Sequence, residues 1–197
     1  YADAALGKLV DSLTRALGSQ RLCILATADH GEAFFEHGVQ GHNANVHEEM
    51  VRIPLVIWAP QSGLGAGARV DAPVSLLDVL PTLVELCDLG ELPPRSRGSS
   101  LLPLLASSPA RADRPIFLSS RYRDDPAKVQ RAVRLGPHKY LVRDGAGTLY
   151  DLAADPEETR DLAADLPAVT SELRELLERW SAEARLESTH APSAPRS

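Results

Sequence analysis

Two short runs of apolar residues, Leu22–Thr27 and Ile53–Ala59, constrain the fold of this 197-residue chain more than any other feature. Each run is almost uninterrupted and too short for a helix, which is typical of a strand buried on both faces of a parallel sheet. The segment 3–17, before the first run, places apolar residues at spacings of three and four, as an amphipathic helix does. A helix beside buried strands predicts an α/β fold with a mostly parallel sheet.

The pattern changes after a proline- and serine-rich stretch at residues 90–115. Short strands are predicted at 116–120, 129–135, 139–143 and 149–152. They favour a small antiparallel sheet, and the periodicity of 167–183 predicts a helix after it. We therefore expect an α/β core over 1–107, a small α+β subdomain over 112–186 and a disordered tail over 187–197.

Composition excludes two classes of protein. The chain has a net charge of −6 and no basic stripe of the kind that a nucleic-acid binder needs, so no nucleic-acid partner is expected. No apolar run approaches the roughly 20 residues that span a bilayer, so no transmembrane segment is predicted. Cys23 and Cys87 both lie in apolar segments and are interpreted as small hydrophobic residues. The chain begins with Tyr1 and not with Met, and we expect it to be part of a longer protein.

Residues 29–49 hold four of the six histidines and five acidic residues. Asp29 and His30, side by side after the first predicted strand, offer a carboxylate oxygen and an imidazole nitrogen, which suit Ca²⁺, Mg²⁺, Mn²⁺ or Zn²⁺. Gly31 follows them and lets the backbone turn. A zincin is excluded because His47-Glu48 is followed by Val51 where H-E-x-x-H needs its second histidine.

Several ordered motifs resemble the sulfatase family of the alkaline phosphatase superfamily. They are Thr27–Glu32 (T-A-D-H-G-E), Glu36–Gly38, Gly41–His42, Glu48–Pro60, Ser75–Leu83, Gly98–Leu105, Leu149–Leu152 and Asp155–Leu162. The resemblance implies the C-terminal part of an alkaline-phosphatase-like core, followed by a small antiparallel sheet with one helix.

The resemblance also implies site residues. Asp29 and His30 correspond to ligands of one divalent cation, calcium first, with magnesium or manganese as alternatives. His42 corresponds to the basic residue that reaches the sulfate ester and acts on its leaving oxygen. The formylglycine nucleophile of the family is expected upstream of this chain, because neither Cys23 nor Cys87 fits C/S-x-P-x-R. The string that begins at Ser107 matches the pattern but follows the metal motif, so we reject it as the nucleophile.

Other polar residues receive structural interpretations. Glu49 and Arg52 are predicted to form an ion pair, and His37 is interpreted as structural. His138 and Lys139 are interpreted as surface or sheet residues, and His47 is assigned no role. Thr27 and Glu32 are expected to support the metal ligands.

The implied function is the metal-dependent hydrolysis of a sulfate ester, carried by a small molecule or a saccharide. This chain would supply part of the metal and substrate site, and we expect it to be inactive alone. Two alternatives remain open: a phosphodiesterase or phosphonate monoester hydrolase of the same superfamily, and a catalytically inert sulfatase-like module.

Overall fold

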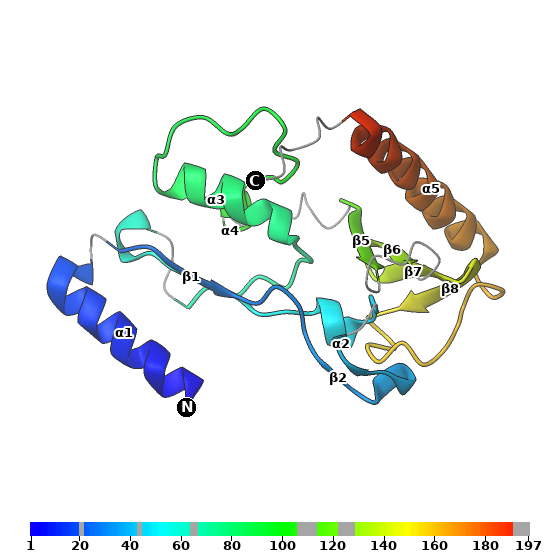
Figure 1. The fold of residues 1–197 in the computed structure, drawn as a ribbon, viewed down its shortest axis with the longest axis horizontal. Helices are drawn as coiled ribbons and strands as arrows, with labels where there is room; N and C mark the ends of the chain where they lie inside the picture. The colour runs from blue at the N-terminus through cyan, green and yellow to red at the C-terminus, as the bar shows by residue number, and fades with distance from the viewer. Residues whose placement is uncertain (20–21, 43–44, 64–66, 106–113, 122–128, 191–197) are drawn as a thin grey trace, which may run out of the picture. The chain divides into compact units, whose positions relative to one another are not determined.

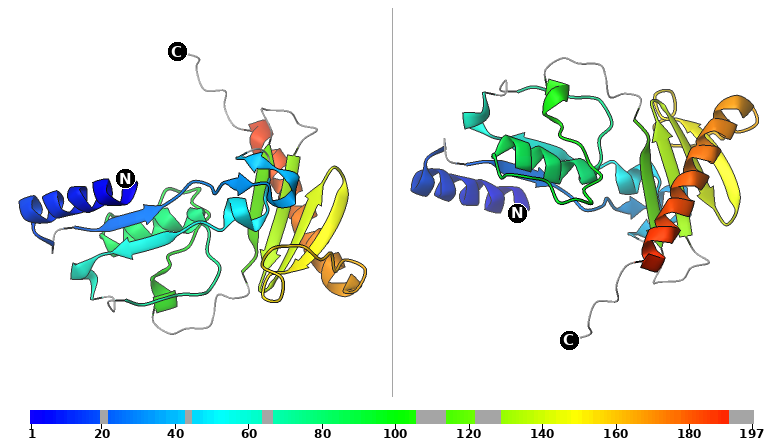
Figure 2. Two further views of the ribbon diagram at one scale, coloured as in Figure 1. Left: turned by 90° about the horizontal axis from the view of Figure 1, so that it is seen from below. Right: turned by 90° about the horizontal axis from the view of Figure 1, so that it is seen from above.

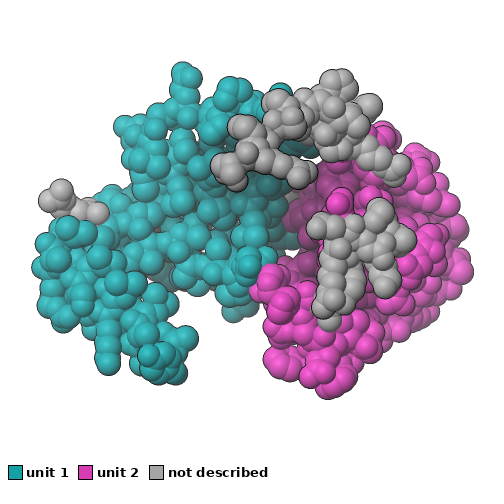
Figure 3. All heavy atoms as spheres, viewed as in Figure 1, with its two compact units in different colours: residues 1–29, 53–112 teal, residues 30–52, 113–197 magenta. Residues whose placement is uncertain are grey.

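The computed structural model describes residues 1–19, 22–42, 45–63, 67–105, 114–121 and 129–190, the last without the side chains of 185–190. The chain forms two compact units (Figure 3). Unit 1 comprises Tyr1–Asp29 and Ile53–Ala112, and unit 2 comprises His30–Arg52 and Asp113–Ser197. The segment 30–52 therefore groups with the C-terminal part of the chain, whereas the sequence analysis assigned it to the first domain.

Unit 1 consists of a two-stranded sheet and several helices (Figure 1). Its elements are α1 (Ala2–Leu17), β1 (Ile24–Thr27), β4 (Leu55–Trp58), η3 (Pro60–Ser62), η4 (Leu76–Asp78), α3 (Val79–Leu86) and α4 (Leu102–Leu105). Pro81 lies in the first turn of α3, where proline leaves a helix intact, and η4 directly precedes α3.

The two strands of unit 1 pair antiparallel, with Ile24 opposite Trp58 and Thr27 opposite Leu55. The sequence analysis assigned these apolar runs to a parallel arrangement buried on both faces. β4 instead alternates between half-buried and exposed residues. The prediction was wrong in this detail because an apolar run reports burial but carries no information on strand direction.

Unit 2 is built on a four-stranded antiparallel sheet in the order β5-β6-β7-β8. The strands are β5 (Ile116–Arg121), β6 (Val129–Leu135), β7 (His138–Arg143) and β8 (Ala146–Asp151). The remaining elements are β2 (Ala33–Phe34), η2 (Glu36–Gly38), β3 (Gln40–Gly41), α2 (Glu48–Val51) and α5 (Pro167–His190). The predicted small sheet and its helix are confirmed, and the strands have nearly the predicted bounds.

The sheet of unit 2 buries both of its faces, because alternate residues of a strand point to opposite sides. One face packs against α5, which crosses the sheet in Figure 2. The residues buried on this face are Val133, Tyr140, Leu149, Leu173 and Leu177. The other face buries the residues Val46, Ala132, Leu141, Tyr150 and Leu152. Val46 comes from the segment 30–52, so this segment is part of the core of unit 2.

The C-terminal helix is longer than predicted. α5 continues to His190, whereas the sequence analysis ended it at Glu183 and began a disordered tail at 187. No glycine or proline interrupts the sequence before Pro192, so the helix has no stop signal there. The rejected string at Ser107 lies outside the described residues. None of the helices in the described part of the chain is long and apolar enough to span a bilayer.

A buried lysine joins the segment 30–52 to the sheet. Lys139 lies on the face of β7 that also bears Leu141, and its side chain is fully buried. Its Nζ lies 2.9 Å from Glu48 Oε1 and 2.9 Å from Glu158 Oε1. Lys139 was interpreted as a surface or sheet residue, and it lies in the sheet but not at the surface. Its two carboxylate partners supply the opposite charges that a buried ammonium needs.

The carboxylate of Glu158 is the second centre of this network. Its Oε2 accepts a hydrogen bond of 2.6 Å from the backbone N–H of Glu48 and lies 3.3 Å from Nδ1 of His47. Burial raises the pKa of Glu158, but the hydrogen bond from His47 and the charge of Lys139 outweigh it, so the pKa lies below its ordinary value. Glu158 is therefore held as a buried carboxylate.

Replacing Lys139 with methionine tests how much this network stabilises the fold. Lys139→Met leaves Glu48 and Glu158 without their shared cation, so we expect the free energy of unfolding to fall by about 3–5 kcal/mol. Urea denaturation measures the change. The control is Lys8→Met, which removes an exposed lysine from α1 and should change stability by less than about 0.5 kcal/mol. Equal effects of the two variants would contradict a structural role for Lys139.

Glu158 also predicts a pH dependence of stability. Its pKa is lower in the folded than in the unfolded chain, so its contribution is complete above the unfolded-state pKa and is lost as the pH falls through the folded-state pKa. Glu158→Gln should therefore flatten the loss of unfolding free energy between about pH 6 and about pH 3. Glu157→Gln, at an exposed neighbour, is the control. An identical acid slope in wild type and Glu158→Gln would refute the assignment.

Candidate functional site

The metal motif lies where the chain passes from unit 1 to unit 2. Asp29 is the last residue of the first segment of unit 1, and His30 is the first residue of unit 2. Before them, the Thr27 hydroxyl donates a 2.8 Å hydrogen bond to the carbonyl of Pro54 and so joins the end of β1 to the start of β4. Thr27 thus supports the motif through the backbone.

Gly31 fixes the backbone directly after His30. Its N–H donates a 2.7 Å hydrogen bond to the carbonyl of Met50, and a Cβ at this position would overlap the carbonyl oxygen of Glu49. Glycine is therefore required for a close approach between the loop and α2. The sequence analysis explained Gly31 by a turn, whereas its φ is not positive and the structural reason is this contact.

The ring of His30 is oriented by the same loop. Its Nδ1 lies 2.8 Å from the carbonyl oxygen of Gly31. A carbonyl oxygen can only accept, so Nδ1 carries the proton and Nε2 carries the lone pair of the neutral ring. A hydrogen bond from one ring nitrogen to a backbone carbonyl is the arrangement that usually orients a metal-ligating histidine. The donor set of Asp29 and His30 thus fits the divalent cation that was predicted.

A short hairpin brings His42 to His30. β2 pairs antiparallel with β3, with Ala33 opposite Gly41, so Glu32 and His42 extend the pair on opposite strands. Nδ1 of His42 lies 3.4 Å from Glu32 Oε2, and the His42 side chain is 67% exposed. The rings of His30 and His42 stack with their centroids 5.0 Å apart. The structure therefore brings these two predicted site residues together, with Glu32 oriented toward His42.

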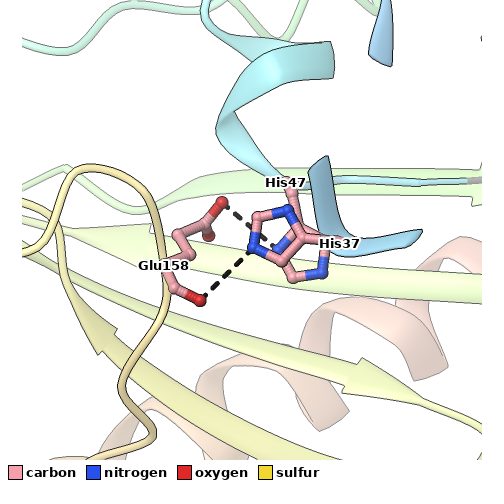
Figure 4. Close-up of side chains that lie close together, drawn as sticks. All are labelled: His37, His47 and Glu158. Atoms are coloured by element: carbon pink, nitrogen blue, oxygen red, sulfur yellow. Dashed lines mark hydrogen bonds and ion pairs between the residues drawn. The ribbon is translucent and has the colours of Figure 1, made fainter. Parts of the chain in front are cut away.

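A second cluster contains His37, His47 and Glu158 (Figure 4). The two imidazole rings stack with centroids 3.8 Å apart and planes 4° apart. His37 Nε2 lies 3.3 Å from the backbone carbonyl oxygen of Glu158, and His47 Nδ1 lies 3.3 Å from its carboxylate. His37 thus has the structural role that was predicted for it.

Glu49 completes the second cluster. Its Oε1 lies 3.1 Å from His37 Nδ1 and accepts a 2.7 Å hydrogen bond from Asn45 Nδ2. The predicted ion pair with Arg52 is wrong, because Arg52 is exposed and has no ion-pair partner among the described residues. A spacing of three suggested that pair, but α2 is only one turn long and the side chain of Glu49 turns toward His37 and Asn45.

The second cluster has the composition of a metal site. One ligand atom from each of His37, His47 and Glu158 lies within 4.8 Å of the others, so the group could hold a cation. A metal lies in the plane of an imidazole at about 2.0–2.1 Å, and two parallel stacked rings cannot both meet this condition unless one rotates. Glu158 is also engaged by Lys139 and Glu48. In this structure, the cluster therefore consists of hydrogen-bonded histidine–glutamate pairs.

The sequence analysis missed His47, Lys139 and Glu158 as organising residues. Lys139 had a detectable signal, because a period-two reading of β7 places it on the same face as the buried Leu141. A lysine on an inward face demands carboxylate partners. Its partners lie far away in sequence, and no local pattern identifies them.

Comparisons with known proteins extend these observations. The sulfatase family model matches residues 1–89. Arylsulfatase K of Mus musculus is 32% identical over 185 residues, which cover 89% of this chain and 33% of that protein. The structure of BT4656 in complex with its substrate D-glucosamine-2-N,6-O-disulfate has a TM-score of 0.78 and 25% identity, covering 93% of this chain and 38% of that chain.

A phosphonate monoester hydrolase of Agrobacterium radiobacter is also similar, with a TM-score of 0.77 and 29% identity over 92% of this chain and 39% of that one. The chain spans about a third of the length of the arylsulfatase K proteins that it matches. These similarities confirm the alkaline-phosphatase-like fold that the motifs predicted. Because the family model covers the metal motif and the sequence and structural similarities extend over both units, this chain belongs to the sulfatase family of the alkaline phosphatase superfamily.

Proposed function

We propose that the complete protein hydrolyses a sulfate ester, with one divalent cation held in part by Asp29 and His30. The observation that carries the proposal is the orientation of His30, whose Nδ1 donates to the carbonyl of Gly31 and whose ring stacks on that of His42. With its proton on Nδ1, the His30 ring can bind a cation through Nε2, next to a second, exposed imidazole. The relatives named arylsulfatase K support the choice of reaction.

When bound, the cation would supply Lewis-acid stabilisation of negative charge on the sulfate oxygens and the nucleophile. Asp29 and His30 would hold it, with calcium as the first choice and magnesium or manganese as alternatives. The formylglycine nucleophile is proposed to lie outside this chain, because neither cysteine is followed by the required motif. The chain then contributes part of the site and is inactive alone.

His42 is proposed to act on the leaving oxygen. A ring that is protonated on both nitrogens donates from Nε2 to that oxygen, while the Glu32 carboxylate, 3.4 Å from Nδ1, stabilises its positive charge. His42 would thus be the general acid, and Glu32 would be a positioning residue. The exposure of both side chains keeps this pair open to a substrate.

We propose a sulfated saccharide or small sulfated molecule as the substrate class. The support is the solved relative BT4656, which is in complex with a disulfated glucosamine. The similarity to a phosphonate monoester hydrolase favours a second candidate activity on phosphonate or phosphate diesters. The third possibility, a catalytically inert module, predicts no turnover of a sulfate, phosphonate or phosphate ester. Parallel assays of an aryl sulfate, an aryl phosphonate and an aryl phosphate diester with the complete protein discriminate among the three.

Replacing Asp29 tests the metal site. Asp29→Asn keeps the shape of the side chain but removes its charge, so we expect divalent-metal affinity to fall at least about tenfold, with a parallel loss of aryl sulfate turnover. Isothermal titration calorimetry of the complete protein measures the affinity. Asp11→Asn, on the exposed surface of α1, is the matched control. Full turnover with unchanged metal affinity in Asp29→Asn would exclude Asp29 as a ligand.

Replacing His42 tests the proton donor. His42→Ala should lower kcat by about 10²–10⁴ for a poor leaving group such as an alkyl alcohol. The loss should be much smaller for nitrophenol, which leaves without a proton. Metal affinity should not change. Glu32→Gln removes the charge that stabilises the imidazolium, so it should shift the alkaline limb of the pH profile of kcat to lower pH, as expected for a positioning residue. Equal losses for good and poor leaving groups would contradict general-acid catalysis by His42.

A further inference from the structure

A pocket of about 250 Å³ opens beside the second cluster, entirely within unit 2. Its walls come from β7, β8 and the two stacked histidines. The lining residues are His37, His47, Leu141, Arg143, Ala146, Thr148 and Tyr150. No carboxylate is among these lining residues, although acidic residues outnumber basic ones in the chain.

Arg143 contributes an uncompensated positive charge to this pocket. It is the last residue of β7 and is exposed, and within the described part of the chain its side chain has no hydrogen bond or ion pair. Two other arginines of unit 2 are paired with carboxylates: Arg134 lies 3.7 Å from Glu48, and Arg160 lies 2.8 Å from Asp165. A guanidinium without a carboxylate partner is well suited to bind a planar or tetrahedral oxyanion.

Tyr150 adds a neutral donor. Its pKa is raised, chiefly by burial, while the hydrogen bond from Thr148 and the charge of Arg143 act in the opposite direction. The phenol therefore stays protonated at neutral pH. A protonated phenol is a hydrogen-bond donor, so the Tyr150 O–H can donate to a ligand in this pocket.

The carboxylates behind the histidine rings do not oppose an anion. Glu158 is paired with Lys139, whose Nζ lies 2.9 Å away, and accepts the hydrogen bond from Glu48. Glu49 is engaged by Asn45 and by His37. The two ring nitrogens of His37 lie next to oxygen atoms, Nδ1 next to the Glu49 carboxylate and Nε2 next to the backbone carbonyl of Glu158. The carboxylates of Glu49 and Glu158 are thus already matched by positive or hydrogen-bond donor groups.

We propose that this pocket binds an oxyanion, with Arg143 as the charged anchor and Tyr150 as a hydrogen-bond donor. Its volume is slightly below the roughly 300–1,000 Å³ of pockets for drug-sized ligands, so it suits one anionic group. In the complete protein, this group is a second sulfate of the substrate, distinct from the ester that is cleaved. This last step rests on the proposed function, whereas anion binding does not.

The test separates anion binding from turnover. Calorimetry measures the affinity of the complete protein for inorganic sulfate in the presence of EDTA and in an Asp29→Asn background, which weakens any sulfate binding at the metal site. Arg143→Ala should lower the sulfate affinity at least about tenfold, and Tyr150→Phe by a smaller factor. The control Arg121→Ala removes an exposed arginine from β5 of the same sheet and should have no effect. Equal losses for Arg143→Ala and Arg121→Ala, or no sulfate binding in EDTA, would overturn the proposal.

Kinetics tests the substrate step. In a protein with intact Asp29, Arg143→Ala should raise KM about tenfold for a disulfated monosaccharide such as D-glucosamine-2-N,6-O-disulfate. It should not change KM for a monosulfated aryl ester. Equal effects on the two substrates would overturn the assignment to a second sulfate. If the wild type turns over neither substrate but binds sulfate in a way that depends on Arg143, the proposed function is refuted and the proposal of an anion pocket stands.

Discussion

The fully buried ammonium of Lys139, held between Glu48 and Glu158, is the interaction on which the rest of unit 2 depends. A lone charge in the interior is costly, and both carboxylates must stay in place to offset that cost. One carboxylate belongs to α2 and the other to the turn after β8. The ion pairs therefore join the segment 30–52 to the C-terminal sheet.

This anchoring has a functional consequence. The segment 30–52 carries His30 and His42, and its C-terminal end is fixed by Glu48, by the buried Val46 and by the hydrogen bond between Gly31 and Met50. A loop that bears the proposed metal ligand and general acid needs such rigid support, because small displacements of reacting groups are costly in rate. The sulfatase-like C-terminal sheet thus acts as a scaffold for residues that lie next to the metal motif in sequence.

Local patterns predicted the local structure of this chain well. The strands β5–β8 and the start of α5 at Pro167 follow from alternation, turns and helical periodicity, all of which operate over a few residues. The antiparallel pairing of β1 with β4 was not predictable from their apolar composition. Neither were the contacts of Lys139 and His47 with partners 91 and 111 residues away in sequence. The motif resemblance predicted Asp29, His30 and His42 as site residues, and in the structure the rings of the last two stack.

The most direct test of the metal assignment is a crystal structure of the complete protein soaked in Mn²⁺, with anomalous scattering recorded to locate the ion. We predict a strong anomalous peak within about 2.0–2.6 Å of an Asp29 oxygen and of His30 Nε2. The stacked rings of His37 and His47 should keep their hydrogen bonds to Glu49 and Glu158. A peak between His37, His47 and Glu158, with none at Asp29 and His30, would contradict the assignment.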